Sequence, residues 1–413
     1  MTEDLARRGR VAILRTSPET VLEDYARLME LAGVRDALPQ DKETLLKINI
    51  SWQTWYPACS TAPWQLEGVI RGLRAAGYED LIAAHNDTVV VDAHLGERNN
   101  KHKYVVDTYG IRNVHLFEPQ YDWVRYEPPE PFLVLDDIYP EGVYIPELLI
   151  GRNMVQLPTV KTHVFTTITG AMKNAFGGLL GRRRHWTHAD IHKTLVDLLM
   201  IQQDIHPGLF AVMDGTFAGD GPGPRAMRWH EKDILLASAD QVAIDAMSAR
   251  LQGFDPLHIP FIRIAHEKGL GIGDPEQIDI VGEDGDWVMA QDWGFVREDT
   301  FASWGQKAIY HGPLKPLEGL LLRSPLVPWS YFASNFYHNV YWYPFVGRER
   351  VENALNTKWG QLFVEYGTEA GLRGAVMPGM EKKTVITAAA GLAVLATAIG
   401  AGILLLKQGR GKA

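Results

Sequence analysis

A chain of 413 residues with a formal net charge of −9 at pH 7 is too long for a typical single hydrophobic core, and its acidic balance argues against nucleic acid as a partner. Nucleic acids are bound through clustered Lys and Arg, which this chain carries only locally. The one cysteine, Cys59, excludes an intramolecular disulfide and a Cys-ligated iron–sulfur cluster supplied by this chain.

Up to residue 157 the chain alternates short apolar runs with amphipathic segments. Val21, Tyr25 and Leu28 recur at helical spacing, whereas V-A-I-L and L-L-K-I are short continuous runs, as in buried strands. This alternation is typical of a parallel sheet with right-handed helical crossovers. We expect strands at residues 9–15, 44–50, 81–84, 114–117, 132–135 and 155–157, and helices at 19–31 and 64–76.

The same pattern continues to residue 284. Strands are expected at 209–213, 234–238 and 278–281, and helices at 240–251, capped by Asp240, and at 259–267. We therefore predict an α/β fold of two Rossmann-like three-layer lobes with mainly parallel sheets, at residues 1–150 and 151–284.

Two segments of different character follow. Residues 285–380 are rich in Trp, Tyr and Phe, and we expect residues 325–345 either to lie against a bilayer or to pack against the α/β body. Residues 384–406 carry no charge and, as a helix, would cross roughly 30 Å of hydrocarbon. We expect a single-pass C-terminal anchor in the lipid bilayer and, because no N-terminal signal sequence is visible, a cytoplasmic main body.

Chemically able side chains are densest between residues 157 and 199. This stretch contains P-T-V-K-T-H, ending at His163, and A-M-K-N-A-F-G-G-L-L-G-R-R-R-H-W-T-H, ending at His188. Basic side chains beside glycine-rich backbone suit phosphate or carboxylate, although the arginines would equally suit anionic lipid. The predicted anion-binding cations are Lys161, Lys173, Arg182, Arg183 and Arg184.

A divalent metal is one alternative for this stretch. Thr187 and Asp190 have capping-box spacing, which would place His188 and His192 on one helical face, with Asp214 or Asp220 completing a site. A histidine on an apolar stripe is, however, more often a hydrogen-bonded core residue. The acids have turn and capping roles as equal alternatives to binding a cation or acting as bases. P-loop, dinucleotide, G-x-S-x-G and H-E-x-x-H motifs are absent from the sequence.

Several motifs in order resemble the domain of unknown function 362 family, an uncharacterised group of α/β proteins. They are L-L-K-I-N-I, P-T-V-K-T-H, T-G-A-M-K-N-A-F-G-G-L-L-G, V-M-D-G-T-F-A-G-D-G-P-G-P and I-L-L-A-S-A-D-Q-V-A-I-D-A, all within residues 44–282. The resemblance implies a site that includes Lys161, His163, Lys173, Asn174, Asp214, Asp220 and Gly221. Many relatives carry ferredoxin-type cysteine clusters, from which this single-cysteine chain departs.

The leading hypothesis is a membrane-anchored enzyme at the cytoplasmic membrane face, acting on an anionic or amphiphilic substrate such as a lipid, isoprenoid, quinone or pigment. Its reaction and cofactor are not defined by the sequence. The catalytic candidates are His163, Lys173, His185 and Asp214. One alternative is a non-enzymatic accessory or assembly factor bound to a membrane protein partner, and another is a redox enzyme that uses a partner's cofactor.

Overall fold

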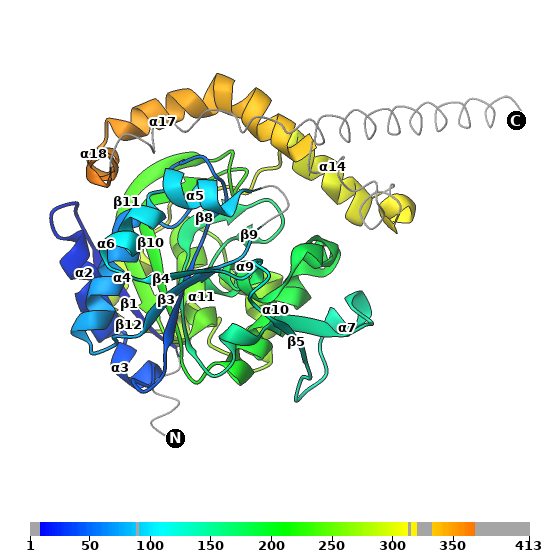
Figure 1. Ribbon diagram of the computed structural model, residues 1–413. Coiled ribbons are helices and arrows are strands. Elements are labelled where there is room, and N and C mark those ends of the chain that lie inside the picture. The colour runs from blue at the N-terminus through cyan, green and yellow to red at the C-terminus, as the bar shows by residue number, and fades with distance from the viewer. Residues whose placement is uncertain (1–8, 88–90, 313–314, 320–332, 368–413) are drawn as a thin grey trace, which may run out of the picture. The chain divides into compact units, whose positions relative to one another are not determined.

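A computed structural model describes residues 9–87, 91–312, 315–319 and 333–367 (Figure 1). The chain divides into two compact units. The first contains the residues up to Thr300 together with 347–375, and the second contains 301–346 together with 376–413. The first unit holds the sheet and the candidate site.

A ten-stranded sheet forms the centre of the first unit. In spatial order its main path is β12 (Asp279–Gly282), β1 (Arg10–Arg15), β11 (Arg228–Ser238), β10 (Leu209–Asp220), β7 (Asn153–Leu157), β2 (Thr44–Ile48), β3 (Leu81–His85) and β4 (Arg112–His115). β8 (Thr159–His163) pairs in parallel with β10 and antiparallel with β9 (Thr167–Ile168). Only β11 runs antiparallel to its neighbours on the main path, so the predicted mainly parallel α/β fold is confirmed.

The expectation of two separate lobes needs correction. β7 pairs in parallel with β2, from the first expected lobe, and with β10, from the second. All five residues of β7 and of β2 are buried, as in parallel strands covered on both faces. The hydrogen-bond ladder therefore continues across residue 150, and strands from both expected lobes build one sheet.

Helices cover both sides of the strands, with α2, α4 and α6 on one side and α10 and α11 on the other (Figure 1). A separate two-stranded sheet joins β5 (Trp123–Tyr126) and β6 (Val143–Pro146). The helices are α2 (Val21–Leu31), α3 (Val34–Ala37), α4 (Pro63–Ala75), α5 (Ala93–Asn99), α6 (His102–Thr108), α7 (Leu135–Ile138), α8 (Ala171–Asn174), α9 (Phe176–Leu179), α10 (Ile191–Ile205), α11 (Gln241–Gln252), α12 (Pro260–Glu267), α13 (Gly285–Met289), α17 (Arg348–Leu355) and α18 (Lys358–Glu365), with 3-10 segments η1 (Glu147–Leu149), η2 (Arg182–Asp190), η3 (Pro256–His258) and η4 (Pro275–Gln277).

The close packing of α2 on α4 depends on two glycines. A Cβ atom at Gly68 would lie 2.4 Å from Cδ2 of Tyr25, and one at Gly72 would lie 2.2 Å from Cε of Met29. Such contacts are far inside van der Waals distance, so glycine permits the approach of the two helices. This approach brings Tyr25 over β10.

The strand expected at residues 132–135 does not form. The buried carboxylate of Asp197 accepts hydrogen bonds from the backbone N–H groups of Leu133, Val134 and Leu135, at 2.7, 3.0 and 3.1 Å. These donors are used at the start of α7 and are lost to any sheet ladder.

The second unit is described by α14 (Phe301–Tyr310), the 3-10 segment η5 (Lys315–Leu317) and the π-helix η6 (Phe336–Gly347). Among the described residues, no helix is both long and apolar enough to span a membrane. The anchor predicted at residues 384–406 lies outside the described residues, as does 325–332 of the predicted interfacial segment.

Candidate functional site

Four basic side chains come together beyond the carboxyl ends of the central parallel strands. Lys47 lies near the end of β2, Lys161 in β8, Lys173 in α8 and Arg184 in η2. Lys47, Lys161 and Arg184 are buried, with exposed fractions of 5%, 0% and 7%, whereas Lys173 keeps part of its side chain exposed. We call these four residues the lysine cluster. Open α/β sheets bind ligands at this edge.

Neutral oxygen atoms surround the ammonium group of Lys161. Its Nζ donates to the carbonyl of Cys59 at 2.5 Å and to Oγ1 of Thr159 at 3.0 Å. Longer contacts of 3.4 Å reach Oδ1 of Asn49 and Oγ of Ser51. These acceptors fix the position of the ammonium group without neutralising its charge.

Asn174 ties the cluster to the sheet. Its Nδ2 donates to the carbonyl of Lys47 at 2.8 Å and to Oε1 of Gln156 at 2.9 Å, while its Oδ1 accepts from Asn49. The helix that carries Asn174 and Lys173 is in turn capped by Asp245, which accepts from the N–H of Ala171 at 2.6 Å. These hydrogen bonds therefore hold the end of β2 and helix α8 in place around the cations.

The predicted glycine-rich turn lies directly against Lys47. A Cβ atom at Gly178 would lie 3.2 Å from Cε of Lys47, and one at Gly177 would lie 3.5 Å from its Nζ. The ring of Phe176 lies 5.5 Å from Nζ of Lys173 and 6.0 Å from Cζ of Arg184, within reach of a cation–π interaction. The two glycines thus leave room for the Lys47 side chain, and the ring of Phe176 lies near both Lys173 and Arg184.

Burial makes these cations unusually acidic. It lowers the pKa of Lys47 to about 7, with a further contribution from the charge of Arg184. Burial together with the charges of Lys161 and Arg184 lowers the pKa of Lys173 to about 7. Burial likewise lowers the pKa of Lys161 to about 8. Near neutral pH these amines exist in both protonation states.

Within residues 9–87 and 91–300, no carboxylate forms an ion pair with Lys47, Lys161 or Lys173. Burial lowers the pKa of Arg184 to about 10, and the charge of Asp87 partly offsets that effect. The Arg184 guanidinium also donates to the Asp87 carbonyl. A buried charge without an opposite charge is costly, and neighbouring like charges add to the cost. The arrangement favours an anionic ligand that supplies the missing charge.

The predicted acids lie elsewhere. Oδ2 of Asp214 accepts from Oη of Tyr25 at 2.6 Å and from Nε1 of Trp64 at 3.0 Å, and its Oδ1 accepts from Oγ1 of Thr216 at 2.8 Å. The structure thus gives the Asp214 carboxylate partners in the core between α2, α4 and β10, and none of these partners belongs to the lysine cluster.

Asp220 and Gly221 connect two segments of the chain. Asp220 accepts from Arg228 at 2.9 Å and from the N–H of Val296 at 2.8 Å. Gly221 has a φ of +93°, which favours glycine, and its N–H donates to the carbonyl of Val296 at 3.1 Å. This part of the D-G-P-G-P motif therefore holds the segment that follows α13 at the end of β10 through hydrogen bonds.

The arginine run separates into different environments. Arg183 is exposed, pairs with Glu141 and lies 5.1 Å from the ring of Trp186. Arg184 is buried, and its charge acts on Lys47 and Lys173. The side chain of Arg182 lies outside the described part of the structure. Of these arginines, the structure places Arg184 in the cluster.

Of the predicted histidines, His188 lies close enough to the lysine cluster for the charge of Lys173 to act on it. Nδ1 of His163 accepts from the N–H of Phe165 at 3.1 Å. Burial and the charge of Lys173 lower the pKa of His188 to about 3, and its ring packs edge-on against Phe176. His185 precedes it and faces Nδ1 of His188 with its carbonyl at 3.1 Å.

The proposed capping box at Thr187 and Asp190 needs correction. The hydroxyl of Thr187 donates to the carbonyl of Arg184 at 2.8 Å, and α10 begins only after the 3-10 segment. His188 therefore precedes the helix that carries His192, and the ring of His192 stacks on Phe261. Among the described residues, these two histidines join no group of three metal-ligating side chains. The positive charge of Lys173 beside His188 also disfavours a metal cation there.

Lys47 and Asn49 lie within the strand that the sequence predicts at residues 44–50, but they are not among the predicted site residues. The signal was available, because polar residues that follow a buried strand meet those of neighbouring parallel strands at one edge. Their contact with Lys161 and Asn174 comes from strand order, which the sequence pattern does not reveal.

Fold and site together define a mixed α/β protein with a mainly parallel sheet and a buried basic cluster at its carboxyl edge. The chain belongs to the DUF362 family, a domain of unknown function, which it matches over residues 44–250. That region contains all four residues of the lysine cluster, and the resemblance seen in the motifs is confirmed.

One curated relative is a thylakoid-associated protein of Synechocystis sp., which is 31% identical over 128 residues. The aligned region covers 30% of this chain and 40% of the relative, so the chain spans well under two thirds of that protein's length. No solved structure matches the chain.

Proposed function

We propose that the chain is a membrane-associated enzyme whose lysine cluster binds a negatively charged group of the substrate. The observation that carries this proposal is the convergence of Lys47, Lys161, Lys173 and Arg184 without a carboxylate on any of the lysines, in the part of the chain that the structure describes. A phosphate or carboxylate ligand offsets the cost of burying these charges.

Proton transfer is the chemistry that the cluster suits best. General acid–base catalysis is most effective when the pKa of the catalytic group lies near the working pH. Lys47 and Lys173 both have a pKa lowered to about 7, chiefly by burial. Binding of an anion favours the ammonium form and raises these pKa values, so substrate binding takes up protons that a lysine then donates. Lys173 is the best candidate, because it retains some exposure.

An amphiphilic substrate is supported by features outside the site. Large aromatic side chains of the second unit are exposed, among them Phe301 at 82% and Phe345 at 75%. Exposed aromatic residues are characteristic of surfaces that meet a membrane or a protein. The relative named as thylakoid-associated and the apolar segment at residues 384–406 agree with membrane association.

The test identifies the small molecules that stay bound to the protein during purification. Full-length protein is purified in detergent, and its small molecules are extracted and profiled by mass spectrometry alongside Lys173→Met and a control, Lys232→Met. Lys232 is a matched control, because burial also lowers its pKa but its Nζ lies over Trp293, at 4.9 Å, outside the cluster.

We expect an anionic compound that is retained by the wild type and by Lys232→Met and is lost from Lys173→Met. Profiles that are identical in all three proteins, with inorganic sulfate and phosphate also failing to bind, would contradict the proposal. If the purified wild type carries no anionic compound and a membrane protein co-purifies with it stoichiometrically, the accessory-factor alternative is favoured.

A further inference from the structure

A second cluster of ionisable groups lies at the ends of β3 and β4. His85 and His115 are the last residues of these parallel strands and pair in register. Side chains at paired positions of neighbouring strands project on the same side of a sheet. The ring centroids of the two histidines are 4.8 Å apart.

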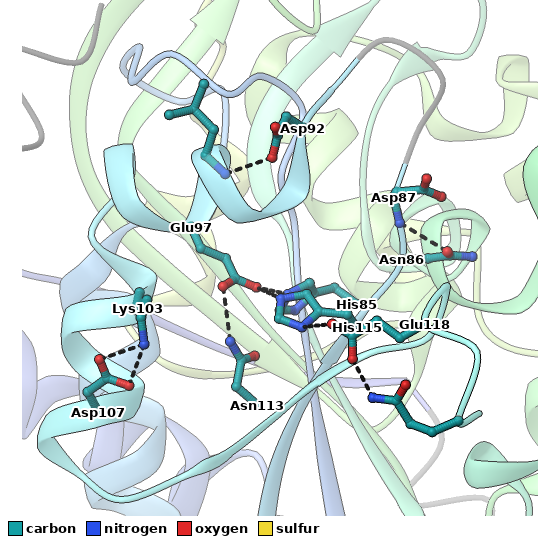
Figure 2. A network of polar contacts seen from close by, with 12 residues as sticks. His85, Asn86, Asp87, Asp92, Glu97, Lys103, Asp107, Asn113, His115 and Glu118 are labelled. Atoms are coloured by element: carbon teal, nitrogen blue, oxygen red, sulfur yellow. Dashed lines mark hydrogen bonds and ion pairs between the residues drawn. The ribbon is translucent and has the colours of Figure 1, made fainter. Parts of the chain in front are cut away.

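Helix α5 adds a carboxylate to this pair. Oε1 of Glu97 lies 2.7 Å from Nε2 of His115 and also contacts Nε2 of His85. All three side chains are buried, at 2% exposure for His85 and Glu97 and 9% for His115. Figure 2 shows them pointing toward one another from two strands and a helix. Their ligand atoms all lie within 4.8 Å of one another.

An outer layer of polar contacts orients these groups. Nδ2 of Asn113 donates to Oε2 of Glu97 at 3.0 Å, and Oε1 of Glu118 lies 3.5 Å from Nδ1 of His115 (Figure 2). Metal-ligating histidines commonly use one ring nitrogen for the metal and give the other to a carboxylate. The contacts of His115 follow that division.

We propose that His85, Glu97 and His115 bind a divalent transition metal ion. Two imidazoles and one carboxylate are the ligand set of zinc, iron(II) and manganese sites that keep positions open for a further ligand. Each of the three side chains offers one ligand atom to the ion, and Nδ1 of His85 is buried without a hydrogen-bond partner in the described chain. The site rests on these residues alone and does not depend on the lysine cluster.

The neighbouring His94 gives a second arrangement, His94–His115–Glu118. His94 and Glu97 lie three residues apart on α5, and the His94 ring centroid lies 4.2 Å from that of His115. His94 is exposed, whereas all three residues of the first group are buried. A dry site strengthens metal binding, so we assign the ion to the buried group.

Cobalt(II) and zinc are suitable probes, used on full-length protein in detergent after treatment with a chelator. We expect one equivalent of cobalt(II), with visible absorption from a site of low coordination number, and its displacement by zinc. His115→Ala and Glu97→Gln should abolish the absorption. Glu118→Gln removes the negative charge from the outer contact of His115 and should weaken binding by about 10- to 100-fold while the protein stays folded.

Three variants serve as controls. His258 is an exposed histidine that pairs with Asp255, and His258→Ala should keep the full signal, as should His94→Ala. Lys173→Met should also keep it, which separates this site from anion binding. A folded wild type without cobalt absorption, or an unchanged signal in the His85→Ala/His115→Ala double variant, would overturn the proposal and leave Glu97 as a structural partner of the two histidines.

Discussion

Asp214 and Lys161 are buried on neighbouring strands of one sheet, β10 and β8, and both are charged groups that the sequence singled out. Tyr25, Trp64 and Thr216 all donate to Asp214. Lys161 instead meets neutral oxygens and the positive charge of Lys173. Burial raises the pKa of Asp214, and the hydrogen bonds from Tyr25, Thr216 and Trp64 oppose that shift. The difference between the two residues is that the acceptors of Asp214 are used within the fold, whereas the Lys161 ammonium group has no opposite charge beside it in the described chain.

The largest effect is expected when lysine charges that have no opposite charge beside them are removed, which should weaken anion binding. Sulfate is a suitable probe because it stays fully ionised across the relevant pH range. The double variant Lys161→Met/Lys173→Met should weaken sulfate binding by about 100-fold or more at about pH 6.5, since each charge-assisted hydrogen bond contributes roughly 1.5–3 kcal/mol. Isothermal titration calorimetry measures this, with Lys232→Met as the control. An unchanged affinity would remove the distinction between the two regions.

Asp214, whose hydrogen-bond donors all belong to the core, should behave differently. Asp214→Asn disturbs three side-chain donors in the core and should lower the free energy of unfolding by about 1–3 kcal/mol. The affinity of the folded variant for sulfate should equal that of the wild type. Urea denaturation and calorimetry check the two parts. A stable variant that loses sulfate binding would instead place Asp214 in the site, as the sequence analysis expected.

The pH dependence of sulfate binding sharpens the comparison. Lys47 and Lys173 have pKa values lowered to about 7, chiefly by burial. A bound anion would favour the ammonium forms and raise both pKa values. Binding is therefore strongest below pH 7 and is lost as the lysines deprotonate. We expect at least about a tenfold loss of affinity between pH 7 and 8.5, measured by calorimetry. A flat profile would show that these lysines stay charged or do not touch the anion.

The smallest expected effect is a gain in stability. The pKa of Lys47 falls from its ordinary value of 10.5 to about 7 on folding, mainly through burial, so between these values the unfolded chain binds more protons and stability rises with pH. Lys47→Met removes the charge that costs stability below pH 7. We expect a gain of about 1–2 kcal/mol in urea denaturation near pH 6 that shrinks toward pH 9. A loss of stability at both pH values would contradict the account.

The sequence predicted most of the elements but not how the strands pair. Periodicity located β2, β7 and β10, whose pairing makes one sheet of the two expected lobes. Pairing depends on contacts between segments far apart in the chain, which local patterns do not encode. The failed strand at residues 132–135 has the same origin, because its backbone donors bond to Asp197.

The candidate site was predicted in part. The density of basic residues indicated Lys161, Lys173 and Arg184, and the structure brings these three together with Lys47. Asp214 was chemically as plausible, but its donors Tyr25 and Trp64 lie 189 and 150 residues away in the sequence. The metal-ligating group was missed although H-L-G-E at residues 94–97 and H-L-F-E at 115–118 repeat one spacing.

We expect an anion to bind among Lys47, Lys161, Lys173 and Arg184. Crystallography of the full-length protein with selenate tests it most directly, because anomalous scattering locates selenium. We expect a selenium peak within hydrogen-bonding distance of the lysine ammonium groups that disappears in Lys161→Met/Lys173→Met. A well-ordered site without that peak, at a selenate concentration that saturates binding in solution, would contradict it.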